Sequence, residues 1–101
     1  MVRHGIEFRE GEIAEFCRRH RIHRLSLFGS IVRDDFRPDS DIDVLVEFEP
    51  EATVGLIRFA GIERELSDLV GRKVDLNTPN MLSPYFRDEV LAEAEVRYVA
   101  G

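Results

Sequence analysis

The sequence predicts a mixed α+β or α/β fold in which helices pack on a small mixed β-sheet. Its 101 residues suit one hydrophobic core. Its hydrophobic spacing switches between helix and strand periods in the order α-β-α-β-α-β-α-β, with no internal repeat. Apolar residues make up 44% of the chain and charged residues 34%, a mix typical of a globular protein. We therefore expect residues 1–101 to form one domain.

The first third of the chain predicts a helix, a strand and a short helical segment. Residues 10–20 place apolar side chains at helical spacing and basic ones in the last turn, where cations suit the helix dipole. Residues 22–28 have the composition of a strand, and Gly29-Ser30 ends it. A short helical segment over about 30–34 is expected to follow.

A second strand and the longest helix are predicted in the middle of the chain. A loop rich in Asp, Pro and Ser over 35–40 leads into a strand over 41–48. Residues 53–71 carry a single apolar stripe at helical spacing. Thr53 is the expected N-cap of this helix, and Gly71 stands where a glycine commonly ends one.

The last quarter predicts a strand, a helix and a final strand. Residues 73–77 have the pattern of a strand, which Thr78-Pro79 breaks. Ser83-Pro84 is expected to open a helix that runs to about residue 94, because proline is favoured at the first helical position. Residues 96–99 are the expected last strand.

Charge and cysteine content exclude several classes of function. Fourteen Lys and Arg against twenty Asp and Glu give a net charge of −6, which disfavours general nucleic-acid binding. The single cysteine, Cys17, excludes an intrachain disulfide and a cysteine-based zinc site, and three scattered histidines do not suggest another. Because the chain has no membrane-spanning apolar run and no signal-peptide pattern, we expect a cytoplasmic protein without membrane contacts.

Three further side chains are assigned to the core. Cys17 lies on the apolar face of the first predicted helix, where it is most simply a packing residue. Tyr85 and Phe86 could line a site, meet a partner or pack in the core, and core packing is the preferred interpretation.

The strand that ends in Phe28-Gly29-Ser30 has features of a phosphate-binding turn. Glycine allows the backbone to turn and to approach a ligand closely. The free amides that follow it and the Ser30 hydroxyl can bind phosphate oxygens. A Gly-Ser turn is also an ordinary connection from strand to helix, so the pattern alone leaves both interpretations open.

Two aspartates in the second strand are unusual for a strand. Residues two apart share a face, so Asp41 and Asp43 point the same way while Ile42 and Val44 point into the core. Two like charges side by side repel, and aspartate is a poor strand former. A divalent cation with oxygen ligands would remove the repulsion. The alternative is a solvated strand edge whose aspartates have no function.

A third aspartate has the same setting. Val74-Asp75-Leu76 repeats the apolar-Asp-apolar pattern on the next strand, so Asp75 could join the face of Asp41 and Asp43. Three carboxylates on two strands would make a two-metal platform. Taken alone, Asp75 is more simply a solvent-facing residue.

Together these residues resemble the minimal nucleotidyltransferases, small members of the DNA polymerase β-like nucleotidyltransferase superfamily. The family pattern is a hydrophobic residue with Gly-Ser, then Asp-hydrophobic-Asp-hydrophobic, then an Asp on a later strand. Phe28-Gly29-Ser30, Asp41-Ile42-Asp43-Val44 and Asp75 match it, and Arg33 matches a Gly-Ser-x-x-Arg form of the first part. The resemblance covers about residues 10–98 and implies the polymerase β-like fold.

The resemblance also implies a role for each matching residue. Asp41, Asp43 and Asp75 would bind two metal ions, Mg²⁺ with Mn²⁺ as the alternative. Asp75 would also deprotonate the acceptor hydroxyl.

Three residues would bind the nucleotide according to the same resemblance. Gly29 and Ser30 would hold the β- and γ-phosphates. Arg33 would lie near the triphosphate or the leaving pyrophosphate, and the alternative for Arg33 is a surface cation paired with Asp34.

The implied activity is transfer of AMP from ATP to a hydroxyl, expected to be a tyrosine, on a partner protein. Stand-alone members of the family are often antitoxins of a helical HEPN-type toxin, which would be both acceptor and binding partner in a homo- or hetero-oligomer. The alternative is a non-catalytic antitoxin or scaffold that neutralises its partner by contact. A template-directed polymerase fragment is the least favoured interpretation.

One departure from the family pattern bears on activity. Many relatives have glycine after the motif arginine, whereas this chain has Asp34 followed by Asp35, and five aspartates fall within residues 34–43. This charge should weaken nucleotide binding unless metal or Arg33 and Arg37 compensate for it.

Overall fold

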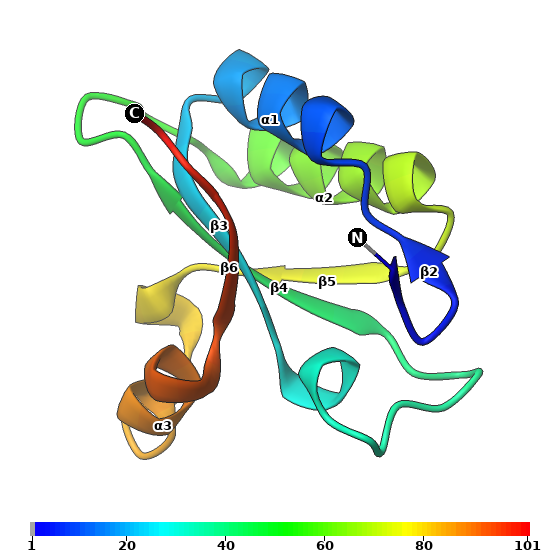
Figure 1. Ribbon diagram of the computed structural model, residues 1–101. Helices are drawn as coiled ribbons and strands as arrows, with labels where there is room; N and C mark the ends of the chain where they lie inside the picture. Colours follow the sequence, from blue (N-terminus) through cyan, green and yellow to red (C-terminus); the bar gives the residue numbers. More distant parts are fainter. Residues whose placement is uncertain (1) are drawn as a thin grey trace.

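The protein is built on a four-stranded mixed sheet, with a separate two-stranded sheet at the N-terminus (Figure 1). The computed structural model describes residues 2–101. The larger sheet has the strand order β5-β4-β3-β6, in which β4 and β5 are parallel and the other neighbours antiparallel. Its strands are β3 (Ile22–Phe28), β4 (Ile42–Phe48), β5 (Val74–Asn77) and β6 (Glu95–Val99). The predicted mixed sheet with packed helices is confirmed.

Helices α1 (Glu10–Arg19) and α2 (Leu56–Val70) lie over one face of this sheet and enclose the main core (Figure 1). Alternate residues of the strands point into this core, as the period-two pattern predicted. The buried set includes Phe16 and Cys17 of α1, Ile62 and Leu66 of α2, and Ile42, Val44, Val46, Val74 and Leu76 of the strands. The core position predicted for Cys17 is confirmed. Among residues 2–101, no helix is both long and apolar enough to cross a membrane.

The opposite face of the sheet carries shorter elements. Helix α3 (Arg87–Glu93) and the 3₁₀ turn η2 (Pro79–Met81) belong to this side of the molecule (Figure 1). A second 3₁₀ turn, η1 (Gly29–Val32), follows the end of β3 and buries Ile31 in the main core. Phe28 and Leu45 point to this face and are buried, yet they lie outside the main core cluster. This second face also receives the aspartates of β4 and β5, because they alternate with the core residues.

The longest helix begins later than predicted. Thr53 is not its N-cap, because the chain stays extended through Gly55, which holds that position before Leu56. Val54 explains the difference, since its partly buried side chain packs against the core from this extended segment. The predicted C-terminal glycine is confirmed: Gly71 has a φ of +73°, and its amide donates to the Ser67 carbonyl.

Two other predicted helices also differ from the structure. The segment expected over 30–34 is the 3₁₀ turn η1, which ends at Val32. Helix α3 begins at Arg87 and not at Pro84, because the amides of Phe86 and Arg87 both bond to the Ser83 carbonyl and close a turn first.

The core position preferred for Tyr85 and Phe86 is wrong. Both side chains lie in this turn before α3, with exposed fractions of 92% and 61%.

The N-terminal hairpin was not predicted. Strands β1 (Val2–Arg3) and β2 (Ile6–Glu7) pair antiparallel across His4 and Gly5, whose φ values are +50° and +79°. Two consecutive residues with positive φ are the signature of a type I′ hairpin turn. The sequence feature that could have indicated this hairpin is the dipeptide His4-Gly5 between two short segments of alternating polar and apolar residues.

Candidate active site

Three aspartates lie on the sheet side opposite the main core, two of them in register on neighbouring strands. The parallel register pairs Asp43 of β4 directly with Asp75 of β5. Asp41 precedes β4 by one residue and lies close enough to raise the pKa of Asp43. Asp41 and Asp43 are half-buried, whereas Asp75 is exposed. The strand alternation in the sequence therefore placed Asp43 and Asp75 on the same face, whereas Asp41 precedes β4 and lies outside the alternation.

The three carboxylates form a site of concentrated negative charge. The pKa of Asp43 is raised to about 6, first by burial and then by the charges of Asp75 and Asp41, while Arg33 lowers it. The ammonium of Lys73 lies 3.7 Å from Oδ2 of Asp41 and balances part of the charge. Clustered carboxylates of this kind favour a bound divalent cation, because the cation offsets their mutual repulsion.

The Gly29 turn lies directly against Asp43. Strand β3 ends at Phe28, which is the register partner of Asp43, so the next residue passes over the Asp43 side chain. Gly29 has a φ of +73°, and a Cβ at this position would lie 3.1 Å from Cγ of Asp43 and would overlap its Oδ2. Glycine is therefore required here for two reasons, the left-handed backbone and the space that the carboxylate fills.

Ser30 and Arg33 occupy the same turn. Ser30 is half-buried at the start of η1, and its carbonyl accepts a hydrogen bond from the Arg33 amide at 3.0 Å. The guanidinium of Arg33 pairs with Asp35 at 3.3 Å and with Glu93 of α3 at 3.1 Å. The partners of Arg33 are thus Asp35 and Glu93, and not Asp34 as the surface alternative supposed.

The three aspartates have the right chemistry to bind a hard divalent cation, but their side chains are not drawn together as they would be around a bound ion. Carboxylate oxygens from β4 and β5 are the ligands that Mg²⁺ prefers, and the register holds their backbones side by side. Within residues 2–101, no three His, Cys, Asp or Glu side chains are grouped closely enough to hold a metal ion.

Two charged residues at the site carried no signal in the sequence. Lys73 was read only as the start of a strand, and Glu93 only as part of a helix. Both reach the aspartate face through tertiary contacts, Lys73 to Asp41 and Glu93 to Arg33.

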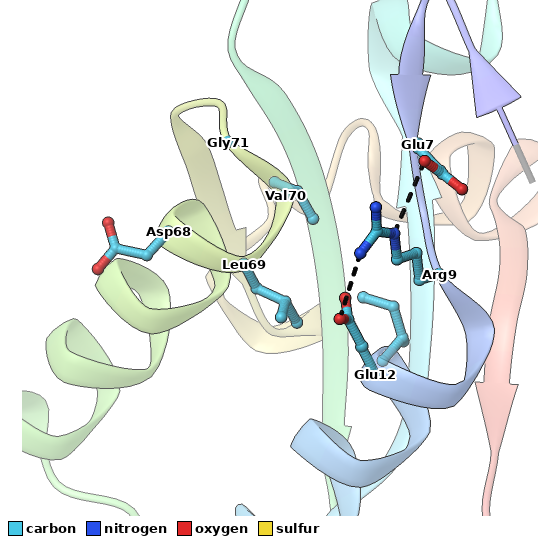
Figure 2. A pocket seen from close by; sticks show the side chains of 8 residues that line it. Glu7, Arg9, Glu12, Asp68, Leu69, Val70 and Gly71 are labelled. Atoms are coloured by element: carbon cyan, nitrogen blue, oxygen red, sulfur yellow. Dashed lines mark ion pairs between the residues drawn. The ribbon is translucent and has the colours of Figure 1, made fainter.

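A cavity of about 260 Å³ lies elsewhere, between the start of α1 and the end of α2. Figure 2 shows its arginine, Arg9, turned toward Glu7 and Glu12, with which it forms ion pairs at 3.6 Å. The helices that line it cover the core face of the sheet, so this cavity and the three aspartates lie on opposite sides. It contributes nothing to the aspartate site.

A family comparison decides what this arrangement is. Residues 11–96 match the model of the family described as "Nucleotidyltransferase domain". The chain belongs to this nucleotidyltransferase family. The resemblance to the minimal nucleotidyltransferases seen in the sequence is confirmed, and so is the polymerase β-like fold.

Two relatives of this nucleotidyltransferase are described as protein adenylyltransferases. A candidate protein adenylyltransferase of Methanocaldococcus jannaschii is 39% identical over 77 residues, which are 75% of this chain and 80% of that protein. Protein adenylyltransferase MntA of Thermococcus cleftensis is 35% identical over 79 residues, 78% of each chain.

Solved structures share the fold. A structure described as a candidate minimal nucleotidyltransferase superimposes with a TM-score of 0.69 at 38% identity, over 84% of this chain and 85% of that one. A toxin–antitoxin crystal structure with AMP-PNP gives a TM-score of 0.73 at 21% identity, over 92% and 75%. A complex of a tri-AMPylated Shewanella oneidensis HEPN toxin with an MNT antitoxin gives 0.65 at 20% identity, over 90% and 70%.

Proposed function

We propose that this nucleotidyltransferase moves AMP from ATP to a tyrosine hydroxyl of a HEPN-type toxin and is the antitoxin of that pair. The observation that carries the proposal is the pairing of Asp43 with Asp75 beside the Gly29 turn. It is supported by the relatives named as protein adenylyltransferases. It is also supported by similarity to antitoxins solved with an ATP analogue and with an AMPylated HEPN toxin.

The aspartates are assigned to metal binding and proton transfer. Asp41, Asp43 and Asp75 would hold Mg²⁺. Bound there, Mg²⁺ would neutralise phosphate charge and lower the pKa of the acceptor hydroxyl. Since the pKa of Asp43 is about 6, its carboxylate is mostly ionised at neutral pH and available as a ligand.

The transfer step is a displacement at the α-phosphorus of ATP. The acceptor oxygen bonds to this phosphorus, the bond to the bridging oxygen of the β-phosphate breaks, and pyrophosphate leaves. The hydroxyl proton passes to a carboxylate oxygen of Asp75. Backbone amides of the Gly29-Ser30 turn and the Ser30 hydroxyl would orient the β- and γ-phosphates, and Arg33 would meet the charge of the leaving pyrophosphate.

The contact-only alternative is tested by the same residues. It rests on the extra charge of Asp34 and Asp35, of which Asp35 is paired with Arg33. This ion pair offsets the charge of Asp35, so the extra aspartates alone do not establish a degenerate site.

The deciding experiment measures the intact mass of the co-expressed HEPN-type partner after incubation with the protein, ATP and Mg²⁺. We expect a gain of one or more AMP units, which is lost in the double variant Asp41→Asn, Asp43→Asn. Asp68→Asn is the matched control, because Asp68 is an exposed aspartate of α2, the helix on the core side of the sheet. If the double variant still neutralises the partner's toxicity and no AMP is added, the contact-only alternative replaces the proposal.

A further inference from the structure

We propose that Arg72 is a positioning residue that holds the loop before Asp41 against the start of β5, the strand of Asp75. The inference rests on the proposed function, because it assigns Arg72 a role in assembling the same metal-binding aspartates. Arg72 lies between the last turn of α2 and the first residue of β5. It is not one of the residues assigned to metal or nucleotide.

The side chain of Arg72 binds the loop through three backbone carbonyls. Its Nη2 donates to the carbonyl oxygens of Arg37 and Ser40, each at 2.8 Å, and to that of Pro38. Ser40 is the residue before Asp41. One half-buried guanidinium therefore satisfies most of the backbone acceptors along the turn that delivers the first aspartate.

Aromatic stacking adds a second attachment between Arg72 and the loop. Cζ of Arg72 lies 4.8 Å from the ring centroid of Phe36. The His4 ring also stacks on Phe36, with 5.0 Å between centroids, and its Nε2 donates to the Arg33 carbonyl at 2.7 Å. His4 of the N-terminal hairpin therefore holds the segment between η1 and Asp41 at its start, through Arg33, and Arg72 holds it at its end, through Ser40.

The backbone around Arg72 explains why its position is fixed. Its amide donates to the Ser67 carbonyl and so closes the end of α2. The next residue, Lys73, accepts a hydrogen bond from the Ile42 amide at 2.9 Å and places its ammonium 3.7 Å from Asp41. The loop and the start of β5 are therefore joined by side chain and by backbone at neighbouring residues.

The chemistry of the loop requires a guanidinium. Five aspartates lie within residues 34–43, and their mutual repulsion favours an expanded loop. A planar guanidinium can stack on Phe36 while it donates to several carbonyls, whereas a lysine ammonium cannot do both. Groups that orient metal ligands in this way typically change metal affinity or activity by about 10- to 100-fold when they are altered.

The test compares Arg72→Lys with Arg64→Lys, a matched change at an exposed arginine of α2. Mn²⁺ alone is titrated into each full-length variant and followed by electron paramagnetic resonance. AMP transfer to the partner is measured at saturating ATP, and thermal unfolding is recorded for each protein. We expect Arg72→Lys to bind Mn²⁺ about tenfold more weakly and to transfer AMP at least about tenfold more slowly, with little change in melting temperature. Arg64→Lys should match the wild type.

A second variant and a second measurement keep the inference separate from general stability. Phe36→Leu removes the stacking partner and leaves the carbonyls in place, so it should show a smaller loss of the same kind. Amide hydrogen exchange should accelerate at Ser40 and Ile42 in Arg72→Lys and not in Arg64→Lys.

Two failures are distinguishable. If the wild type adds no AMP or binds no Mn²⁺, the proposed function fails, and unchanged exchange at Ser40 and Ile42 in Arg72→Lys then overturns the positioning role as well. If the wild type is active and Arg72→Lys has the same Mn²⁺ affinity and transfer rate as Arg64→Lys, only the positioning role is overturned.

Discussion

Replacing Gly29 with alanine tests the link between the turn and Asp43. The substitution has two separable effects. An alanine with a φ of +73° destabilises the fold by about 1–2 kcal/mol, because its Cβ crowds the following carbonyl. The new Cβ also overlaps the Asp43 carboxylate, whose flexible end must move away. The first effect changes stability and the second changes the site.

Gly71 supplies the control for the backbone effect. It has the same φ of +73°, and a Cβ there would meet no atom of residues 2–101 within 4 Å apart from its own chain neighbours. Gly71→Ala should therefore carry the backbone strain without displacing a carboxylate. Both variants should lose roughly 5–15 °C in melting temperature, since about 1 kcal/mol shifts a protein of this size by about 4–8 °C.

The two variants should differ in activity. A misplacement of about 1 Å at a reacting group lowers the rate by about 100-fold, so Gly29→Ala should lose about that much AMP transfer. Gly71→Ala should retain the wild-type rate below its melting temperature. The assay is the intact mass of the partner against time, at a temperature at which both variants are folded. Equal rates in the two variants would refute the assignment of the Gly29 turn to the active site.

Three further predictions concern other parts of the molecule. The fold raises the pKa of Asp43 from 3.8 to about 6, so the folded state favours the protonated carboxyl. The stability that this protonated carboxyl contributes is fully present below about pH 4 and is lost as the pH rises through 6. In metal-free buffer, Asp43→Asn should therefore raise the melting temperature above pH 6 and leave it unchanged below pH 4. Burial raises the pKa of the Cys17 thiol to about 12, so iodoacetamide should label it only after unfolding, which mass spectrometry would detect. Tyr85→Ser should leave the urea midpoint nearly unchanged because the side chain is exposed, whereas Ile62→Ala should destabilise the core by about 2–5 kcal/mol.

Local patterns in the sequence were sufficient for the parts of the fold that carry the aspartates. Strand β3 was predicted with its observed bounds, because seven strand-forming residues run directly into a Gly-Ser turn. The period-two alternation of β4 placed Asp43 on the face opposite Val44, and the same pattern placed Asp75. The alternation does not say which strands are neighbours. That β4 and β5 are parallel neighbours, with Asp43 opposite Asp75, is seen only in the structure.

Features that depend on tertiary contacts could not be predicted from the sequence. Thr53 has the better capping side chain, yet Val54 must stay extended to reach the core, and packing outweighs a cap of about 1 kcal/mol. Proline at position 84 favoured an early helix start, but the bonds to the Ser83 carbonyl form a turn first. Arg72 is one of thirteen arginines in this chain, and nothing in its neighbours indicates three carbonyl acceptors more than thirty residues away.

The ion pairs of Arg33 are compatible with a role at the phosphates. Its guanidinium contacts Asp35 and Glu93 at the surface, where water and salt screen the attraction and the net gain from each pair is small. A nucleotide triphosphate brings several negative charges and accepts charge-assisted hydrogen bonds from a guanidinium, so it would compete well for the same cation. The positive charge of Arg33 lowers the pKa of Asp43, so the guanidinium is close enough to the aspartate site to interact with it electrostatically. Asp35 and Glu93 would then hold the Arg33 guanidinium near the turn until the nucleotide arrives.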